Sequence, residues 1–226
     1  MRIFILILSL LISIHAATNI DNGIEAYNSG KYTIAFKLFQ VEAKKNNPMG
    51  KHLLGSLYYQ GYGIDKDIKQ AISLFKEAAK QNYVPSIANL GLMYSKGDGV
   101  NQNYKTAFMY YNQAANLDDP QSQFNVAQYY RKGIGVAINY KMAVKWYKKL
   151  AEKGVIEAQN EYGLMYAQGQ GVKLDYIEAY AWINMPADAG DTHAIKNKRQ
   201  LLQILNKRER RRAIALANEY KEKYSK

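Results

Sequence analysis

The chain has 226 residues, 48% of them hydrophobic, with a net charge of +12 and no cysteine. A chain of this length can bury a core without metals or disulfides, and the lack of cysteine excludes zinc–cysteine sites, thiol catalysis and disulfide bonds. The charge is uneven, because residues 193–226 contain eleven Lys and Arg against three Glu, a net charge of +8, so the C-terminal end is basic and the rest is nearly neutral.

The N-terminus has the pattern of an export signal. Arg2 supplies a positive start, residues 3–14 are apolar except for two serines, and Ala16 offers a cleavage site. Twelve residues span about 18 Å as a helix, less than the ~30 Å hydrocarbon core of a bilayer. We therefore predict a signal peptide over 1–16, with an uncleaved anchor as the alternative. No cysteine near Ala16 could carry a lipid, so we expect a periplasmic or secreted protein without a transmembrane span after cleavage.

A period of 36 residues organises the middle of the chain. Gly-X-Gly recurs with this spacing, and each copy is followed by Ile or Val. The four copies lie at 61–63, 97–99, 133–135 and 169–171. They divide residues 49–192 into four repeats without insertion, namely 49–84, 85–120, 121–156 and 157–192. A fixed period of this length is typical of proteins built from stacked supersecondary units.

The apolar spacing within each repeat predicts two helices. The first glycine of the motif lies where the first helix ends, and glycine adopts the left-handed conformation of such an end without penalty. An Asp or Asn then precedes the second helix and can cap its first amides. These capping residues are Asp67, Asn103, Asn139 and Asp175. A small residue in the first helix allows close approach of a neighbouring helix, at Gly55, Gly91, Ala127 and Gly163.

These residues carry a family resemblance. The pattern Leu-Gly-x-x-Tyr-x-x-Gly-x-Gly-Val, then Asp, then Lys-x-Ala-x-x-Trp-Tyr-x-x-Ala resembles the Sel-one-like repeat of exported bacterial proteins, a longer-turned relative of the tetratricopeptide repeat. The resemblance implies an all-α fold, a right-handed α/α solenoid of stacked antiparallel helix pairs that binds proteins or peptides along its faces. Residues 17–48 resemble a degenerate N-terminal repeat whose shorter turn lacks Gly-X-Gly.

Pro186 departs from the repeat pattern, because it falls inside the expected second helix of the last repeat. A proline there removes a hydrogen bond and costs about 3 kcal/mol if nothing adapts. We therefore predict that this helix is kinked or shortened near Met185.

Residues 193–226 are interpreted as a basic C-terminal helical cap. One helix is expected to end near Asn206, and a second to begin there, since Asn206 and Glu209 form a capping-box pattern. Its expected apolar face consists of Ile214, Leu216, Ala217 and Tyr220. Its basic residues, which are Lys207, Arg208, Arg210, Arg211 and Arg212, either form a solvated polar face or contact an anionic surface, such as lipid headgroups, envelope polysaccharide or an acidic partner. Predicted export disfavours nucleic acid.

The sequence offers no catalytic constellation. His52 and His193 lie in different parts of the repeat array, and His52 is expected to be an exposed first-helix residue. Glu157 and Glu161 lie four apart on one helix, and we interpret them as a solvated face. Neither a nucleophile elbow nor a phosphate loop is present, and Gly-X-Gly follows helices instead of strands. We therefore predict a protein that is not an enzyme and uses no cofactor or metal.

Positions that vary between repeats are free to bind a partner, whereas constant positions are explained by packing. The variable positions of the first helices mix apolar and polar residues, with Tyr59 and Arg131 as expected anchors. The candidate groove residues are His52, Ser56, Tyr59, Leu92, Phe124, Gln128, Arg131, Asn160 and Leu164. The alternative is that these side chains merely complete the packing between repeats.

The functional prediction is an exported, non-enzymatic repeat scaffold for a protein or peptide partner, acting in the cell envelope or as a secreted virulence-type factor. The alternative is an envelope hydrolase or a protein that binds peptidoglycan or β-lactams. Exported relatives with a cysteine pair in each repeat are described in those terms, but this chain lacks every such cysteine.

Overall fold

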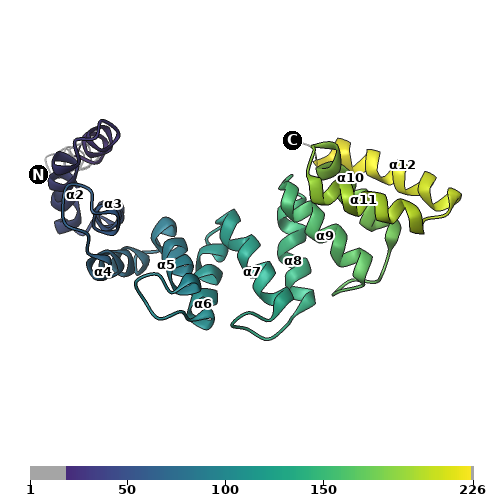
Figure 1. Cartoon of the computed structure of the whole chain (residues 1–226), viewed down its shortest axis with the longest axis horizontal. Coiled ribbons are helices and arrows are strands. Elements are labelled where there is room, and N and C mark those ends of the chain that lie inside the picture. The colour runs from purple at the N-terminus through teal and green to yellow at the C-terminus, as the bar shows by residue number, and fades with distance from the viewer. Residues whose placement is uncertain (1–18, 225–226) are drawn as a thin grey trace, which may run out of the picture. The chain divides into compact units, whose positions relative to one another are not determined.

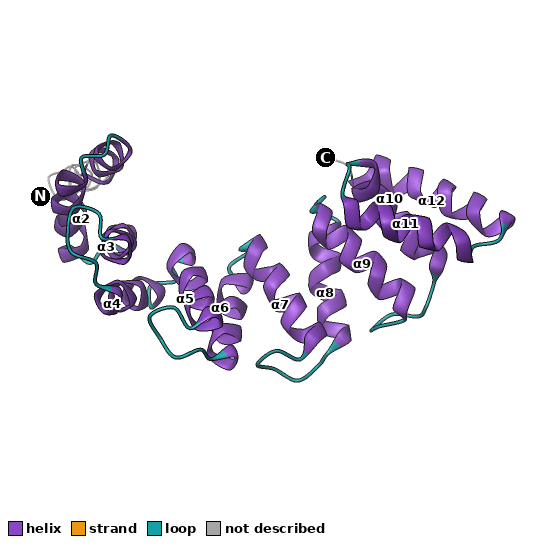
Figure 2. Cartoon of the chain, viewed as in Figure 1, coloured by secondary structure: helices purple, strands orange, loops and turns teal. Residues whose placement is uncertain are grey.

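The computed structural model describes residues 19–224, which are helical apart from short connections and contain no strand (Figures 1 and 2). The predicted signal peptide lies outside these residues. Residues 19–28 are helical and precede α2 (Tyr32–Lys44). The helices that follow are α3 (Pro48–Gln60), α4 (Ile68–Ala79), α5 (Val84–Lys96), α6 (Tyr104–Asn116), α7 (Pro120–Lys132), α8 (Tyr140–Ala151), α9 (Ile156–Gln168), α10 (Tyr176–Asp188), α11 (Thr192–Ile204) and α12 (Lys207–Tyr224).

The helices belong to two compact units, which meet between Leu117 and Asp118 in the sequence. In the first unit α3 packs on α4 and α5 on α6, and α4 also contacts α5. In the second unit α7 packs on α8 and α9 on α10, and α8 also contacts α9. Each predicted repeat is therefore one helix pair, and stacking buries the face that a single pair would leave exposed. This arrangement confirms the all-α solenoid of stacked helix pairs.

The predicted chemistry of the helix ends is confirmed. Each first helix ends at the first glycine of its Gly-X-Gly motif, where φ lies between 63° and 75°. Each second helix is capped by the expected side chain; the Oδ1 atom of Asp67, for example, accepts the backbone N–H of Gln70 at 2.9 Å. Capping satisfies a backbone donor that the first turn of a helix would otherwise leave unpaired.

The second glycine of the motif joins one repeat to the repeat before it. Gly63 has φ +72° and Gly171 has φ +73°. A Cβ atom on Gly63 would lie 2.5 Å from the carbonyl carbon of Tyr32, the first residue of α2. A Cβ atom on Gly171 would lie equally close to Tyr140, the first residue of α8. Glycine is therefore required both for the turn and for the close approach of backbone between repeats.

In three repeats the small residue of the first helix is a glycine that lies against the second helix of the same repeat. A Cβ atom on Gly55 would come within 2.9 Å of the Phe75 ring, and one on Gly163 within 2.5 Å of the Ile183 side chain. The core beside these contacts consists of fully buried aliphatic residues, including Leu57 and Ile87 in the first unit. Close helix packing thus compensates for glycine inside a helix, which costs about 1 kcal/mol relative to alanine.

The expected shortening of α10 at Pro186 is wrong. The helix has 13 residues, as α6 does, and it continues to Asp188. Pro186 lies in the last turn, where its missing N–H costs only the bond to the preceding turn. Its carbonyl still accepts the N–H of Asp191 at 2.9 Å, just as the carbonyl of Ala78 accepts the N–H of Tyr83 in the first full repeat. The kink near Met185 stays a prediction.

Two further helices follow the last repeat and pack on α10. The capping box is formed, because Asn206 Oδ1 accepts the N–H of Glu209 at 3.0 Å and Glu209 Oε2 accepts the N–H of Asn206 at 2.9 Å. The expected apolar face of α12 is partly wrong. Ile214 is 46% exposed, and Ala213 is buried together with Ala217. Residues four apart share a helix face, whereas Ile214 is turned about 100° from Ala213.

Candidate partner-binding site

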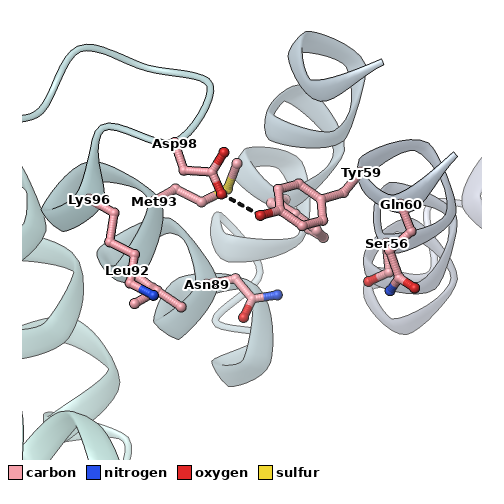
Figure 3. Close-up of a pocket in the computed structure, with 9 residues that line it drawn as sticks. Ser56, Tyr59, Gln60, Asn89, Leu92, Met93, Lys96 and Asp98 are labelled. Carbon is pink, nitrogen blue, oxygen red and sulfur yellow. Dashed lines mark hydrogen bonds between the residues drawn. The ribbon is translucent and has the colours of Figure 1, made fainter. Parts of the chain in front are cut away.

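The first unit contains a pocket of about 220 Å³ between the first helices of two successive repeats (Figure 3). Its walls are α3 and α5, and Phe75 of α4 contributes an aromatic surface. The lining residues are Ser56, Tyr59, Gln60, Phe75, Asn89, Leu92, Met93, Lys96 and Asp98. The structure thus brings three predicted groove residues together, namely Ser56, Tyr59 and Leu92. Sequence analysis missed Asn89 and Lys96, although both lie on the α5 face that carries Leu92.

A hydrogen bond spans this pocket. The Tyr59 hydroxyl donates to Oδ2 of Asp98, which lies in the Gly-X-Gly turn after α5, as Figure 3 shows. This bond and the nearby carboxylate raise the pKa of Tyr59, because removing the proton would place two negative charges side by side. Tyr59 is therefore a fixed wall of the pocket and keeps its hydroxyl proton.

A second, largely apolar hollow of about 320 Å³ shares residues with the first. Ser56 and Gln60 line both, and Tyr27 donates its hydroxyl to Oε1 of Gln60 at 3.2 Å. The other lining residues are Ile24, Phe39 and Leu53. The degenerate first repeat therefore contributes residues to a hollow beside the pocket. Sequence analysis did not predict this, because that repeat lacks the Gly-X-Gly motif that set the register of the others.

The expectation that His52 is exposed is wrong. Its Nδ1 atom lies 2.9 Å from the Ser86 hydroxyl, and its ring centre lies 5.4 Å from that of Phe75 and 5.3 Å from that of Tyr83. Desolvation lowers the pKa of His52 to about 4, because burial disfavours the charged imidazolium. His52 lines neither hollow and completes the packing between two repeats.

The second unit has a hollow of about 400 Å³ that contains Phe124 of α7 and Asn160 and Leu164 of α9. All three were predicted as groove residues. The remaining lining residues are Glu157, Glu161, Asp191, His193 and Asn197. Asn160 is only 8% exposed and accepts a hydrogen bond from Asn197 at 3.0 Å. The edge of this hollow is therefore partly built by α11, which follows the last repeat.

Arg131 and Glu161 form an ion pair with 3.2 Å between Nη2 and Oε2, and each side chain is about one-fifth exposed. The interpretation of Glu161 as part of a solvated face is wrong, because α7 brings a guanidinium to it. Glu157 is exposed as expected. Arg131 is neutralised by this pair instead of being free for a partner. Gln128 is half-buried and does not line the hollow of this unit.

The basic side chains of α12 are exposed at Lys207, Arg208, Arg211 and Arg212. Arg210 is also exposed, but its Nε atom donates to the carbonyl of Leu205 at 2.8 Å. Across residues 19–224, no ion pair joins the first four to a carboxylate. The start of α12 therefore presents uncompensated positive charge.

Residues 19–224 contain no group of three or more His, Asp or Glu that could hold a metal ion. No helix within this range is both long enough and apolar enough to cross a membrane.

Stacked helix pairs, Gly-X-Gly turns and hollows between first helices define an α-solenoid repeat protein. The Sel1 repeat profile matches residues 48–83, 84–119, 120–155 and 156–191. The chain therefore belongs to the Sel1 repeat family, whose members are generally protein-interaction scaffolds and typically non-enzymatic. Each matched stretch begins one residue before the repeat boundary drawn from the sequence.

Two solved structures are similar to the chain. One is c5321 of uropathogenic Escherichia coli, a protective antigen with an SLR fold, at TM-score 0.75 and 27% identity. That match covers 92% of this chain but only 46% of c5321. The other is a Sel1 repeat protein from Oxalobacter formigenes, at TM-score 0.70 and 35% identity, covering 78% of this chain and 70% of that one. No curated protein matches the sequence.

Proposed function

We propose that this chain is an exported, non-enzymatic scaffold that binds a protein or peptide partner in the hollows between its first helices. One observation carries the proposal: the variable residues Ser56, Tyr59 and Leu92 gather around a single pocket, whereas the residues that repeat are used in turns, caps and core. The signal peptide predicted for residues 1–16 is the reason for proposing action in the envelope or outside the cell.

Substitution of Leu92 tests this proposal directly. Leu92 lines the pocket, yet 43% of its surface is exposed, so a partner can bury it at little cost to the free scaffold. Burying an apolar side chain contributes about 1.5–3 kcal/mol. We expect Leu92→Asp to weaken capture of the native partner at least tenfold without lowering the melting temperature by more than a few degrees. Capture is measured by quantitative mass spectrometry of envelope fractions passed over the immobilised chain 17–226.

Met109→Asp is the matched control. Met109 is 63% exposed on α6 and lines none of the hollows described here, so the same substitution there should leave capture unchanged. The proposal fails if the partners retained by the unaltered chain are also retained by Leu92→Asp, or if both variants lose them equally. Circular dichroism separates loss of binding from loss of fold.

We also propose that the start of α12 contacts anionic lipid headgroups. Its support is the uncompensated charge of Lys207, Arg208, Arg211 and Arg212, together with the exposed Ile214 nearby in the same helix. A basic side chain near an anionic membrane contributes about 1 kcal/mol.

Replacing Arg208, Arg211 and Arg212 with Gln should therefore weaken binding to phosphatidylglycerol vesicles roughly a hundredfold at low salt. Sedimentation with vesicles measures the effect. The control replaces Lys37, Lys69 and Lys105, which are also exposed, and so changes the net charge equally. If both variants lose vesicle binding equally, net charge alone explains the binding and the start of α12 has no special role. If the unaltered chain does not bind the vesicles, the proposal of lipid contact is rejected.

A further inference from the structure

The pocket between α3 and α5 contains more hydrogen-bond donors than acceptors. No hydrogen bond or ion pair within residues 19–224 engages the side chains of Asn89 or Lys96. Gln60 uses its Oε1 atom to accept from Tyr27, which leaves its amide N–H groups free. The pocket's one carboxylate, Asp98, is already bonded to Tyr59. A ligand that supplies acceptors would therefore satisfy groups that the protein leaves unpaired.

The charge near this pocket also favours a ligand that supplies acceptors. Lys96 lines it, and the Lys66 ammonium lies 5.6 Å from the centre of the Tyr59 ring. Lys96 and Asp98 are the only charged lining residues and balance each other, so the Lys66 ammonium beside Tyr59 adds a positive charge next to the pocket. The hollow of the second unit is different, since Glu157, Glu161 and Asp191 line it. The preference for negative charge therefore belongs to the first unit and is not a property of every repeat.

Apolar surface lies beside these donors. Asn89, Leu92 and Lys96 lie on one side of α5, because residues three and four apart share a helix face. Phe75 and Leu92 line the same pocket. The pocket can thus hold one large apolar side chain while a neighbouring group of the ligand reaches the ammonium and the amide.

From this arrangement we infer that the pocket binds a segment of a partner polypeptide in which an Asp or Glu lies next to a large apolar residue. The carboxylate accepts hydrogen bonds from Lys96 and Asn89, and the apolar side chain packs against Phe75 and Leu92. This inference rests on the proposed scaffold function and names the chemistry of its partner.

The test uses the chain 17–226 on an array of immobilised twelve-residue peptides in which acidic, basic, polar and apolar residues are placed at random. Bound peptides are expected to be enriched in Asp or Glu beside Leu, Ile or Phe. The best peptide is then measured in solution by fluorescence anisotropy. Changing its acidic residue to the matching amide should weaken binding about tenfold, as charge-assisted hydrogen bonds are lost.

Lys96→Gln should produce a loss of similar size, and that loss should shrink as salt is raised. Lys105→Gln is the matched control, because Lys105 is exposed on α6 and lies outside the pocket. Asn89→Ala should weaken binding less, since it removes a neutral donor. Enrichment of basic or uncharged peptides, equal effects of the two lysine variants, or no peptide bound at all would overturn the inference.

Failure of this inference can be distinguished from failure of the proposed scaffold function. If selected peptides lack an acidic residue but still lose affinity in Leu92→Asp, the pocket binds a partner of other chemistry. If Leu92→Asp leaves native capture unchanged, the scaffold proposal fails at this pocket whatever the array selects.

Discussion

Gly171→Ala is expected to destabilise the second unit by about 3 kcal/mol or more, whereas Gly190→Ala should cost only about 1 kcal/mol. Both glycines have positive φ, +73° and +92°. Alanine is therefore unfavourable at both sites for the same reason, because its Cβ atom disfavours a left-handed backbone. The two sites differ in what a Cβ atom would meet.

At Gly171 a Cβ atom would lie 2.5 Å from both the carbonyl carbon and the carbonyl oxygen of Tyr140. These are backbone atoms at the start of α8, so no side-chain rotation can relieve the clash, and the two repeats must separate. At Gly190 nothing lies within 4 Å. The difference between the two variants therefore isolates the contact between repeats from the cost of the left-handed backbone.

Urea unfolding followed by tryptophan fluorescence measures this difference. Trp146 and Trp182 are the only tryptophans of the chain, and both lie in the second unit, so the signal reports that unit. Equal losses of unfolding free energy in the two variants would show that the close approach at Gly171 contributes nothing to stability.

The second large effect is a loss of stability in acid that depends on His52. The folded state holds the pKa of His52 at about 4, whereas an unfolded histidine has a pKa near 6.5. Between these values the unfolded chain binds a proton that the folded chain does not. The contribution of His52 to the free energy of unfolding is therefore fully present above about pH 6.5. It decreases as the pH is lowered toward 4 and does not decrease further below that.

Between pH 7.5 and pH 4.5 this effect is about 2–3 kcal/mol. The neighbours of the His52 ring do not cause this pH dependence, because Ser86 does not titrate and burial raises the pKa of Tyr83. We expect the difference in unfolding free energy between the unaltered chain and His52→Gln to change by this amount between pH 7.5 and pH 4.5. Comparing variants removes the contribution of carboxylates that titrate in the same range.

Urea titrations followed by far-ultraviolet circular dichroism give these free energies. His193→Gln is the control, because it makes the same substitution at an exposed histidine. A pH dependence in His52→Gln equal to that of the unaltered chain would mean that the proton equilibrium of His52 is not linked to folding.

Much of the candidate site could be predicted only in outline. Variation between repeats singled out Ser56, Tyr59, Leu92, Phe124, Asn160 and Leu164 as candidate groove residues, and the structure places the first three around one pocket and the last three around another. It could not show that Tyr59 is held by Asp98 or that Arg131 is paired with Glu161. In each case the partner comes from another repeat, about 30–40 residues away, and no local pattern encodes that contact.

The sequence by itself determined the repeat length, the helix pairs, the left-handed glycines and the capping residues, because each depends on interactions within a few residues. The tertiary structure alone decided which variable side chains remain accessible. His52 is half-buried because Phe75, Tyr83 and Ser86 lie around it. Asn89 and Lys96 line the pocket, and no hydrogen bond or ion pair within residues 19–224 engages their side chains. Burial and pairing depend on the neighbouring helix, and stacking decides which residues that helix presents.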